Sequence, residues 1–319
     1  QYPVISISLK GVDSNSYEGA YKLLVQSICD EIERFQFLIE SNELTQIDKK
    51  RYFELIDRKM EPDTLAVSLK GLTMLLEKHY HQKVVVLIDE YDVPLAKAYE
   101  NGYYDEMILL ISNFFGNVLK TNDSLAFAVL TGCLRIAKES IFTGLNNFKV
   151  YSITDDEFDE TFGFTNKEVM EMLQYYGLSD RFDEVKEWYD GYRFGNADVY
   201  CAWDVVNYCR DHCKNPNAEL KNYWMNTSGN EIINHFVDSL NQPGMLAKRE
   251  LERLVNGETV VKRVDEMITY KELYTSIDNL WSTMFMTGYL TQHGKEGDGY
   301  YRLAIPNREI RNIIIERIL

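Results

Sequence analysis

Five consecutive apolar residues, Val84 to Ile88, run directly into the acidic sequence Asp89-Glu90-Tyr91-Asp92. A short run rich in β-branched residues is typical of a strand that is buried on both faces, as in the middle of a parallel sheet. In open α/β sheets, ligands lie beyond the carboxyl ends of the strands, which is where these acids follow. The run therefore predicts an α/β fold with a ligand site at the end of a central strand.

The rest of the first half predicts further strands that alternate with helices. This order implies a parallel sheet with right-handed crossovers. The run from Leu125 to Leu130 is expected to be a second buried strand, and we expect the α/β core to occupy residues 1–155. The expected strands are 4–9, 84–88, 125–130 and 150–153, and the helical patterns between them fall at 21–35, 65–76 and 107–118.

The second half, residues 156–319, has a different pattern and is expected to form a mostly helical lid that ends in a winged-helix-like hairpin. Thr165 and Glu168 have the spacing of a capping box, and Gly177 suits a helix C-terminus. Two apolar runs flank a glycine-rich turn between residues 289 and 303, which predicts the hairpin. Asn307 is expected to cap a last helix.

The acids after the central strand suit the chemistry of nucleotide hydrolysis. We expect Asp89 to hold Mg²⁺ through water, because Mg²⁺ binds few carboxylates and keeps several of its waters. Glu90, whose side chain points differently, is expected to act as the general base for an attacking water. This is the Walker B pattern of hydrolytic P-loop NTPases. The alternative is a solvated acidic pair that merely closes a strand.

Polar residues also follow the next expected strand. Thr131 lies at its tip, where a sensor residue would contact the γ-phosphate or the attacking water, and Arg135 offers a charge for a phosphate. We expect Thr131 and Asp92 to contact the cofactor and Arg135 to take part in catalysis. For Arg135, the alternative is a surface residue that pairs with an acid.

Composition excludes several classes of function. The formal net charge of −16 argues against a broad nucleic-acid or anionic-membrane surface. No run of about 18 apolar residues is present, so we expect a cytoplasmic protein without a membrane span. The five cysteines suit a reducing compartment. Zinc bound by Cys201, Cys209, His212 and Cys213 is an alternative to ordinary buried thiols, which we favour.

One expected motif is missing. A phosphate-binding loop of the form G-x-x-x-x-G-K-[ST] does not occur in the 319 residues; Gly294-Lys295 is followed by Glu296. The chain also begins at Gln1 without a methionine. We therefore expect the first strand and the Walker A loop to lie upstream of Gln1, and residues 1–319 to be inactive on their own.

Taken together, the motifs resemble a bacterial family of AAA-ATPase-like proteins that often carry a C-terminal PD-(D/E)XK nuclease-like domain. The resemblance implies an incomplete P-loop NTPase fold of the ASCE type, ATP and Mg²⁺ as cofactors, and roles for Asp89, Glu90 and Arg135 in hydrolysis. The Walker A loop and the nuclease segment of the family are both absent from the sequence. The matching segments are 2–5, 86–95, 130–147, 162–165, 188–195, 223–228, 287–291 and 305–309.

Two functions remain open at this point. The first is an ATP-hydrolysing module, AAA+/STAND-like, that switches an attached effector domain. The second is a non-catalytic scaffold that binds a protein partner, which the acidic charge favours over DNA. Binding of DNA by the C-terminal hairpin is a third and less favoured hypothesis. The basic residues of this part of the chain are too scattered to support it; they are Lys262, Arg263, Lys271 and Lys295.

Overall fold

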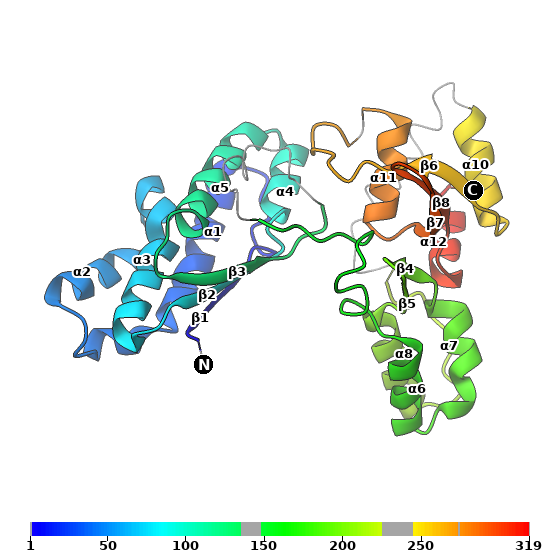
Figure 1. Cartoon of the computed structure of the whole chain (residues 1–319), viewed down its shortest axis with the longest axis horizontal. Coiled ribbons are helices and arrows are strands. Elements are labelled where there is room, and N and C mark those ends of the chain that lie inside the picture. Colours follow the sequence, from blue (N-terminus) through cyan, green and yellow to red (C-terminus); the bar gives the residue numbers. More distant parts are fainter. Residues whose placement is uncertain (1, 135–147, 225–244, 274, 319) are drawn as a thin grey trace. The chain divides into compact units, whose positions relative to one another are not determined.

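A computed structural model describes residues 2–134, 148–224, 245–273 and 275–318 (Figure 1). The chain divides into two compact units, each described by itself below. Unit 1 comprises residues 1–148 together with the short segment 267–271, and unit 2 comprises residues 149–266 and 272–319. None of the described helices has the length and apolar character needed to cross a membrane.

Unit 1 is an α/β unit around a three-stranded parallel sheet in the order β1-β2-β3, so the expected parallel sheet is confirmed. The run from Val84 to Ile88 lies on the middle strand, as predicted, and four of its five residues are buried. The elements are β1 (Val4–Ser8), α1 (Tyr17–Glu33), η1 (Gln36–Glu40), α2 (Gln46–Leu55), α3 (Pro62–Tyr80), β2 (Val84–Asp89), α4 (Val93–Asn101), α5 (Tyr104–Leu119) and β3 (Leu125–Leu130).

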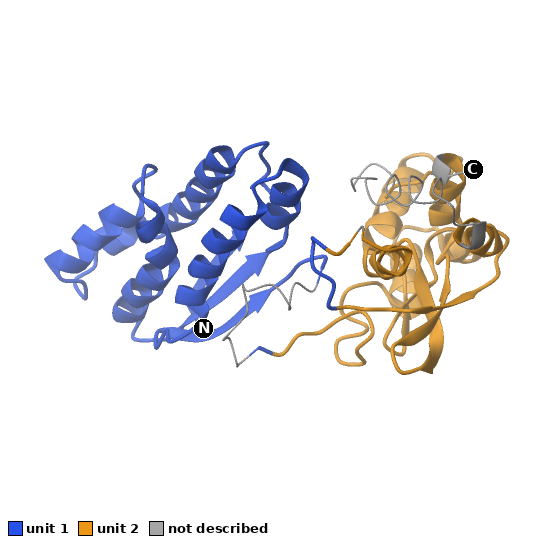
Figure 2. Cartoon of the chain, turned by 90° about the horizontal axis from the view of Figure 1, so that it is seen from above, with its two compact units in different colours: residues 1–148, 267–271 blue, residues 149–266, 272–319 orange. Residues whose placement is uncertain are grey.

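The helices of unit 1 gather on one face of this sheet (Figure 2). Ile5 and Ile7 of β1 point into that covered face and are buried. On the opposite face Phe127 is 52% exposed and Val129 is 46% exposed. The prediction that β3 is fully buried is therefore wrong: within the described residues it is an edge strand, and no helix covers its second face.

Unit 2 combines helices with two small antiparallel sheets, one of the strands β4 and β5 and one in the order β6-β8-β7. The predicted hairpin is present as β7 and β8. Residues 150–153 form no strand, contrary to prediction; instead Ile153 O accepts a hydrogen bond from Gly195 N. The elements are α6 (Asn166–Tyr175), η2 (Ser179–Arg181), α7 (Phe182–Tyr189), β4 (Tyr192–Phe194), β5 (Ala197–Val199), α8 (Ala202–Lys214), α10 (Met245–Val255), β6 (Val260–Arg263), α11 (Ile277–Met286), β7 (Thr291–Gly297), β8 (Tyr300–Ala304) and α12 (Arg308–Ile318).

The local helix signals in unit 2 are confirmed. Thr165 and Glu168 form both hydrogen bonds of a capping box at the start of α6. Gly177 follows that helix with φ at 71°, the left-handed conformation that glycine adopts at little cost. At the start of α12, Asn307 Oδ1 accepts a hydrogen bond from Ile310 N at 3.0 Å. These signals act over three or four residues, so the sequence alone is sufficient to predict them.

Unit 2 buries two acidic side chains that come from different helices. Glu309 of α12 is fully buried, and its Oε1 accepts a hydrogen bond from Trp224 N at 2.7 Å. Asp204 of α8 is 2% exposed. The two carboxyl groups are neighbours within hydrogen-bond reach of each other. Burial raises the pKa of both carboxyl groups, and the neighbouring Asp204 raises the pKa of Glu309 further.

These raised values make the stability of unit 2 depend on pH. A carboxyl group with a raised pKa binds more protons in the folded chain than in the unfolded chain, so stability falls as pH rises from the ordinary carboxyl range towards the raised pKa. Between pH 5 and pH 8 we expect the free energy of unfolding of wild-type unit 2 to fall by on the order of 2 kcal/mol. We expect a smaller fall in the Glu309→Gln variant. Urea denaturation at the two pH values measures this, with the exposed Glu171→Gln as control. If the free energy of unfolding fell equally in Glu309→Gln and in wild type, Glu309 would not be a source of the pH dependence.

Candidate functional site

Three polar side chains meet at the carboxyl ends of the parallel strands. Asp89 ends β2, Ser8 ends β1 directly beside it, and Thr131 follows β3. Thr131 Oγ1 donates to Asp89 Oδ1 at 2.5 Å, and Ser8 Oγ lies 3.4 Å from Asp89 Oδ2. The Asp89 side chain remains exposed. These residues together with Glu90 are called the strand-tip site below.

Glu90 lies at a turn of unusual backbone conformation. Its φ of 52° is left-handed, which costs a residue with a side chain free energy and occurs preferentially at functional sites. The turn is held by the neighbouring strands, because Leu9 N donates to Asp89 O at 2.9 Å and Tyr91 N donates to Thr131 O at 3.0 Å. The half-buried Glu90 carboxylate lies 3.8 Å from Lys10 Nζ. Asp89 and Glu90 are therefore presented at the end of the sheet by a frame of backbone hydrogen bonds.

Asp92 occupies a different environment. Its side chain is 3% exposed, and its Oδ2 accepts hydrogen bonds from Cys133 N at 3.1 Å and Leu134 N at 3.0 Å. The Tyr270 hydroxyl donates to the same oxygen at 3.2 Å. Burial raises the pKa of Asp92, whereas the two N–H donors act in the opposite direction. Three protein donors thus hold this carboxylate inside unit 1.

The start of the segment after β3 is tightly packed against Tyr91 and Asp92. The Tyr91 hydroxyl donates to Leu134 O at 2.6 Å, so both backbone groups of Leu134 are bonded to side chains of the acidic motif. A Cβ atom at Gly132 would lie 2.6 Å from the Tyr91 ring and 2.7 Å from Asp92 Oδ1. Only glycine fits there without displacement of its neighbours. Residues 131–134 are called the sensor segment below.

Some expected residues cannot be placed, and others were missed. Arg135 lies outside the described residues. The sequence analysis overlooked Ser8 and Lys10, although the rule that ligands lie beyond strand ends applies to β1 as well as to β2. It also missed the contact from Tyr270, which is 178 positions away from Asp92 in the sequence. No local pattern could have indicated that contact.

The strand-tip site has donors of the kind that suit Mg²⁺ bound mainly through water. An exposed carboxylate with two hydroxyl neighbours can hydrogen-bond to the waters of a hydrated ion, which is how Asp89 would hold it. Among the residues that the structure describes, no three His, Cys, Asp or Glu side chains converge as a set of direct metal ligands.

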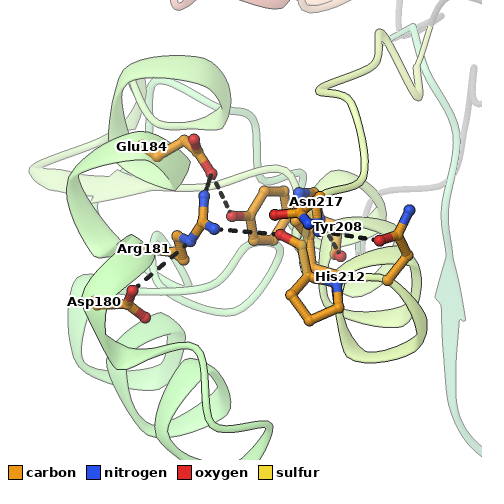
Figure 3. A network of polar contacts seen from close by, with 8 residues as sticks. Asp180, Arg181, Glu184, Tyr208, His212 and Asn217 are labelled. Atoms are coloured by element: carbon orange, nitrogen blue, oxygen red, sulfur yellow. Dashed lines mark hydrogen bonds and ion pairs between the residues drawn. The ribbon is translucent and has the colours of Figure 1, made fainter.

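The cysteine and histidine residues of α8 lie in a different setting. The His212 ring stacks on Tyr208 with the ring centroids 3.9 Å apart, and its Nδ1 lies 3.0 Å from Tyr208 O. Figure 3 shows both residues in a polar network with Arg181 and Glu184. The Tyr208 hydroxyl donates to Glu184 Oε1 at 2.5 Å. Cys209 is buried nearby. His212 therefore packs against its own helix and an aromatic ring.

Comparison with known proteins gives a partial match. The model of a family described as "Predicted AAA-ATPase" matches residues 1–142. A protein of Azotobacter chroococcum mcd 1, named "Uncharacterized protein in vnfD 5'region", is 28% identical over 247 residues. The match covers 75% of this chain and 43% of that protein, so the chain spans less than half the length of its relative. No solved structure matches.

Proposed function

We propose that unit 1 is the core of a P-loop module that binds and hydrolyses ATP, because the model of the AAA-ATPase-like family matches residues 1–142. The observation that supports this most directly is the meeting of Asp89, Thr131 and Ser8 at the ends of three adjacent parallel strands. We also propose that hydrolysis switches an effector domain attached to the module. The relative's greater length leaves room for such a domain.

Each residue of the strand-tip site has a role in this proposal. Asp89 holds the waters of the Mg²⁺ ion, which neutralises charge on the phosphates when it is bound. Glu90 accepts a proton from the water that attacks the γ-phosphate. Thr131 orients the Asp89 carboxylate and faces the phosphates. Arg135 is proposed to bind the γ-phosphate.

We assign Asp92 a different role from the one expected from sequence. Its oxygen Oδ2 is engaged by three protein donors and its side chain is buried, which favours a structural role over contact with a nucleotide. Instead it holds the sensor segment in place. The phosphate-binding loop of the module is proposed to lie upstream of Gln1, because the 319 residues contain no such motif.

Calorimetric titration with ATP, with and without Mg²⁺, tests the proposal. It uses residues 1–319 and a protein extended upstream of Gln1. We expect the extended protein to bind ATP more tightly with Mg²⁺, and Asp89→Asn to lose most of that gain. Asp123→Asn is the matched control, because Asp123 is exposed at the opposite end of the sheet, before β3. Undiminished Mg²⁺ dependence and hydrolysis in Asp89→Asn would refute the assignment.

A non-catalytic scaffold for a protein partner is the second candidate function. It is favoured by the apolar side chains of Phe127 and Val129 on the uncovered face of the sheet, since exposed apolar patches often mark binding surfaces. This function predicts no ATP binding in the extended protein. The same titration therefore distinguishes the two candidates.

A further inference from the structure

The segment from Met267 to Lys271, called the strap below, belongs to unit 1 although the chain on both of its sides belongs to unit 2. Figure 2 shows this division in colour. Ile268 is 2% exposed and Tyr270 is 7% exposed, so the strap is packed rather than loosely laid on the surface. The contacts that these five residues make explain why they belong to unit 1 while their neighbours in the sequence belong to unit 2.

Specific contacts hold the strap in unit 1. The Tyr270 hydroxyl donates to Asp92 Oδ2 at 3.2 Å, and its ring packs edge-on against Tyr104 with centroids 6.3 Å apart. Lys271 Nζ lies 2.7 Å from Asp105 Oδ1. The ion pair is at the surface and contributes little, because Asp105 is 80% exposed. The contact between Tyr270 and Asp92 is buried, so it is the specific one.

The flanks of the strap are anchored in unit 2. Before it, Glu266 accepts a hydrogen bond from the Thr154 hydroxyl, and Asp265 N donates to Ser282 Oγ at 3.0 Å. After it, Asn279 Nδ2 donates to Glu272 O at 2.7 Å. The strap is therefore joined on both sides to residues that are hydrogen-bonded within unit 2.

Asp92 also binds the sensor segment. The oxygen that accepts the Tyr270 hydroxyl also accepts Cys133 N and Leu134 N, which follow Thr131 directly. Thr131 in turn donates to Asp89 Oδ1. A chain of contacts thus runs from the strap through one buried carboxylate to the strand-tip site.

We propose that Tyr270 is a positioning residue through which unit 2 controls the geometry of the strand-tip site. When the Tyr270 hydroxyl is bound to Asp92, the Asp92 carboxylate is fixed, and the sensor segment keeps the Thr131 hydroxyl hydrogen-bonded to Asp89. With the strap withdrawn, Asp92 loses one of its three donors and the sensor segment loosens. The mechanical link stands on these contacts alone, whereas its effect on nucleotide binding rests on the proposed function.

Amide hydrogen exchange in Tyr270→Phe tests the link in residues 1–319 without any nucleotide. The variant keeps the ring and removes the hydroxyl. A hydrogen bond to a charged group is lost, so we expect the amides of Cys133 and Leu134 to exchange about ten- to a hundredfold faster. The amides of Val86 and Ile88 in the buried strand should exchange at the wild-type rate, which separates local loosening from general destabilisation.

Lys271→Gln is the matched control, because it changes the same strap without touching Asp92. We expect its exchange at Cys133 and Leu134 to stay within a factor of about two or three of wild type. If the amides of Tyr270→Phe cannot be assigned because the variant is unstable, Asp92→Asn provides a second test. We expect faster exchange at the same two amides in that variant. Unchanged exchange at Cys133 and Leu134 in a folded Tyr270→Phe or Asp92→Asn protein would overturn the proposal.

A second measurement separates this inference from the proposed function. In the protein extended upstream of Gln1, Tyr270→Phe should weaken Mg²⁺-ATP binding by about tenfold, while Lys271→Gln should not. If the wild-type extended protein binds no ATP, the proposed function fails, and the exchange experiment still decides whether the strap holds the sensor segment. If ATP binds equally to wild type and Tyr270→Phe, control by the strap is refuted and the ATPase assignment stands.

Discussion

Replacement of Gly191 by Ala should lower the unfolding free energy of unit 2 by about 2–6 kcal/mol. Gly191 has φ at 107°, a conformation that costs any residue with a side chain about 1–3 kcal/mol. An added Cβ would also lie 1.9 Å from the carbonyl oxygen of Pro306, which is backbone and cannot rotate away. Overpacking of this kind costs about 1–3 kcal/mol. Because domains are stable by only about 5–15 kcal/mol, the loss can be enough to unfold unit 2.

Gly257→Ala is the control that separates the two causes. Gly257 also lies in unit 2 and has φ at 85°, but a Cβ there would meet no atom within 4 Å. Gly257→Ala should therefore cost only the free energy of placing alanine in a left-handed backbone conformation, about 1–2 kcal/mol. Urea denaturation followed by circular dichroism measures both variants. Equal losses in the two would show that the close approach of Gly191 to Pro306 contributes nothing.

Replacement of Glu90 by Gln in the protein extended upstream of Gln1 should reduce ATP turnover by about 10²–10⁴-fold, the usual contribution of a general base. The amide has nearly the same shape as the carboxylate but cannot accept the proton of the attacking water. The backbone frame around Glu90 consists of main-chain hydrogen bonds that the substitution leaves in place. Affinity for Mg²⁺-ATP should therefore change far less than turnover.

Steady-state phosphate release at saturating ATP measures this effect, and calorimetry measures binding. The control is Glu54→Gln, which neutralises an exposed acid on α2 and should leave turnover unchanged. Turnover in Glu90→Gln within threefold of wild type would remove Glu90 from the role of base. A loss of nucleotide binding as large as the loss of turnover would instead indicate that Glu90 serves binding.

Much of the fold was predictable from short stretches of sequence. The apolar run from Val84 to Ile88 is the middle strand, and Asp89 ends it as expected. The capping box at Thr165, the turn at Gly177 and the cap at Asn307 also occur where their patterns predicted them. In each case the deciding interactions connect residues no more than about four positions apart, so they can be predicted from a single segment.

The candidate site was predictable only in part. Strand ends indicated Asp89 and Thr131, and the structure brings these two side chains to hydrogen-bond distance. The same reasoning treated Asp92 as a ligand-facing acid, although it is buried. Its environment depends on Cys133, Leu134 and Tyr270, which approach it from two distant parts of the chain. Burial of an acid is decided by such approaches and leaves no local pattern.

By itself the sequence determined the three strands of unit 1, the C-terminal hairpin, the caps and the acidic end of the middle strand. These depend on periodicity and on hydrogen bonds within a few residues. Tertiary structure alone decided that one face of β3 is exposed, that Asp92 is buried under three donors, and that residues 267–271 belong to unit 1. Each of these depends on which distant segments pack together, because burial and the pairing of polar groups are properties of the assembled chain.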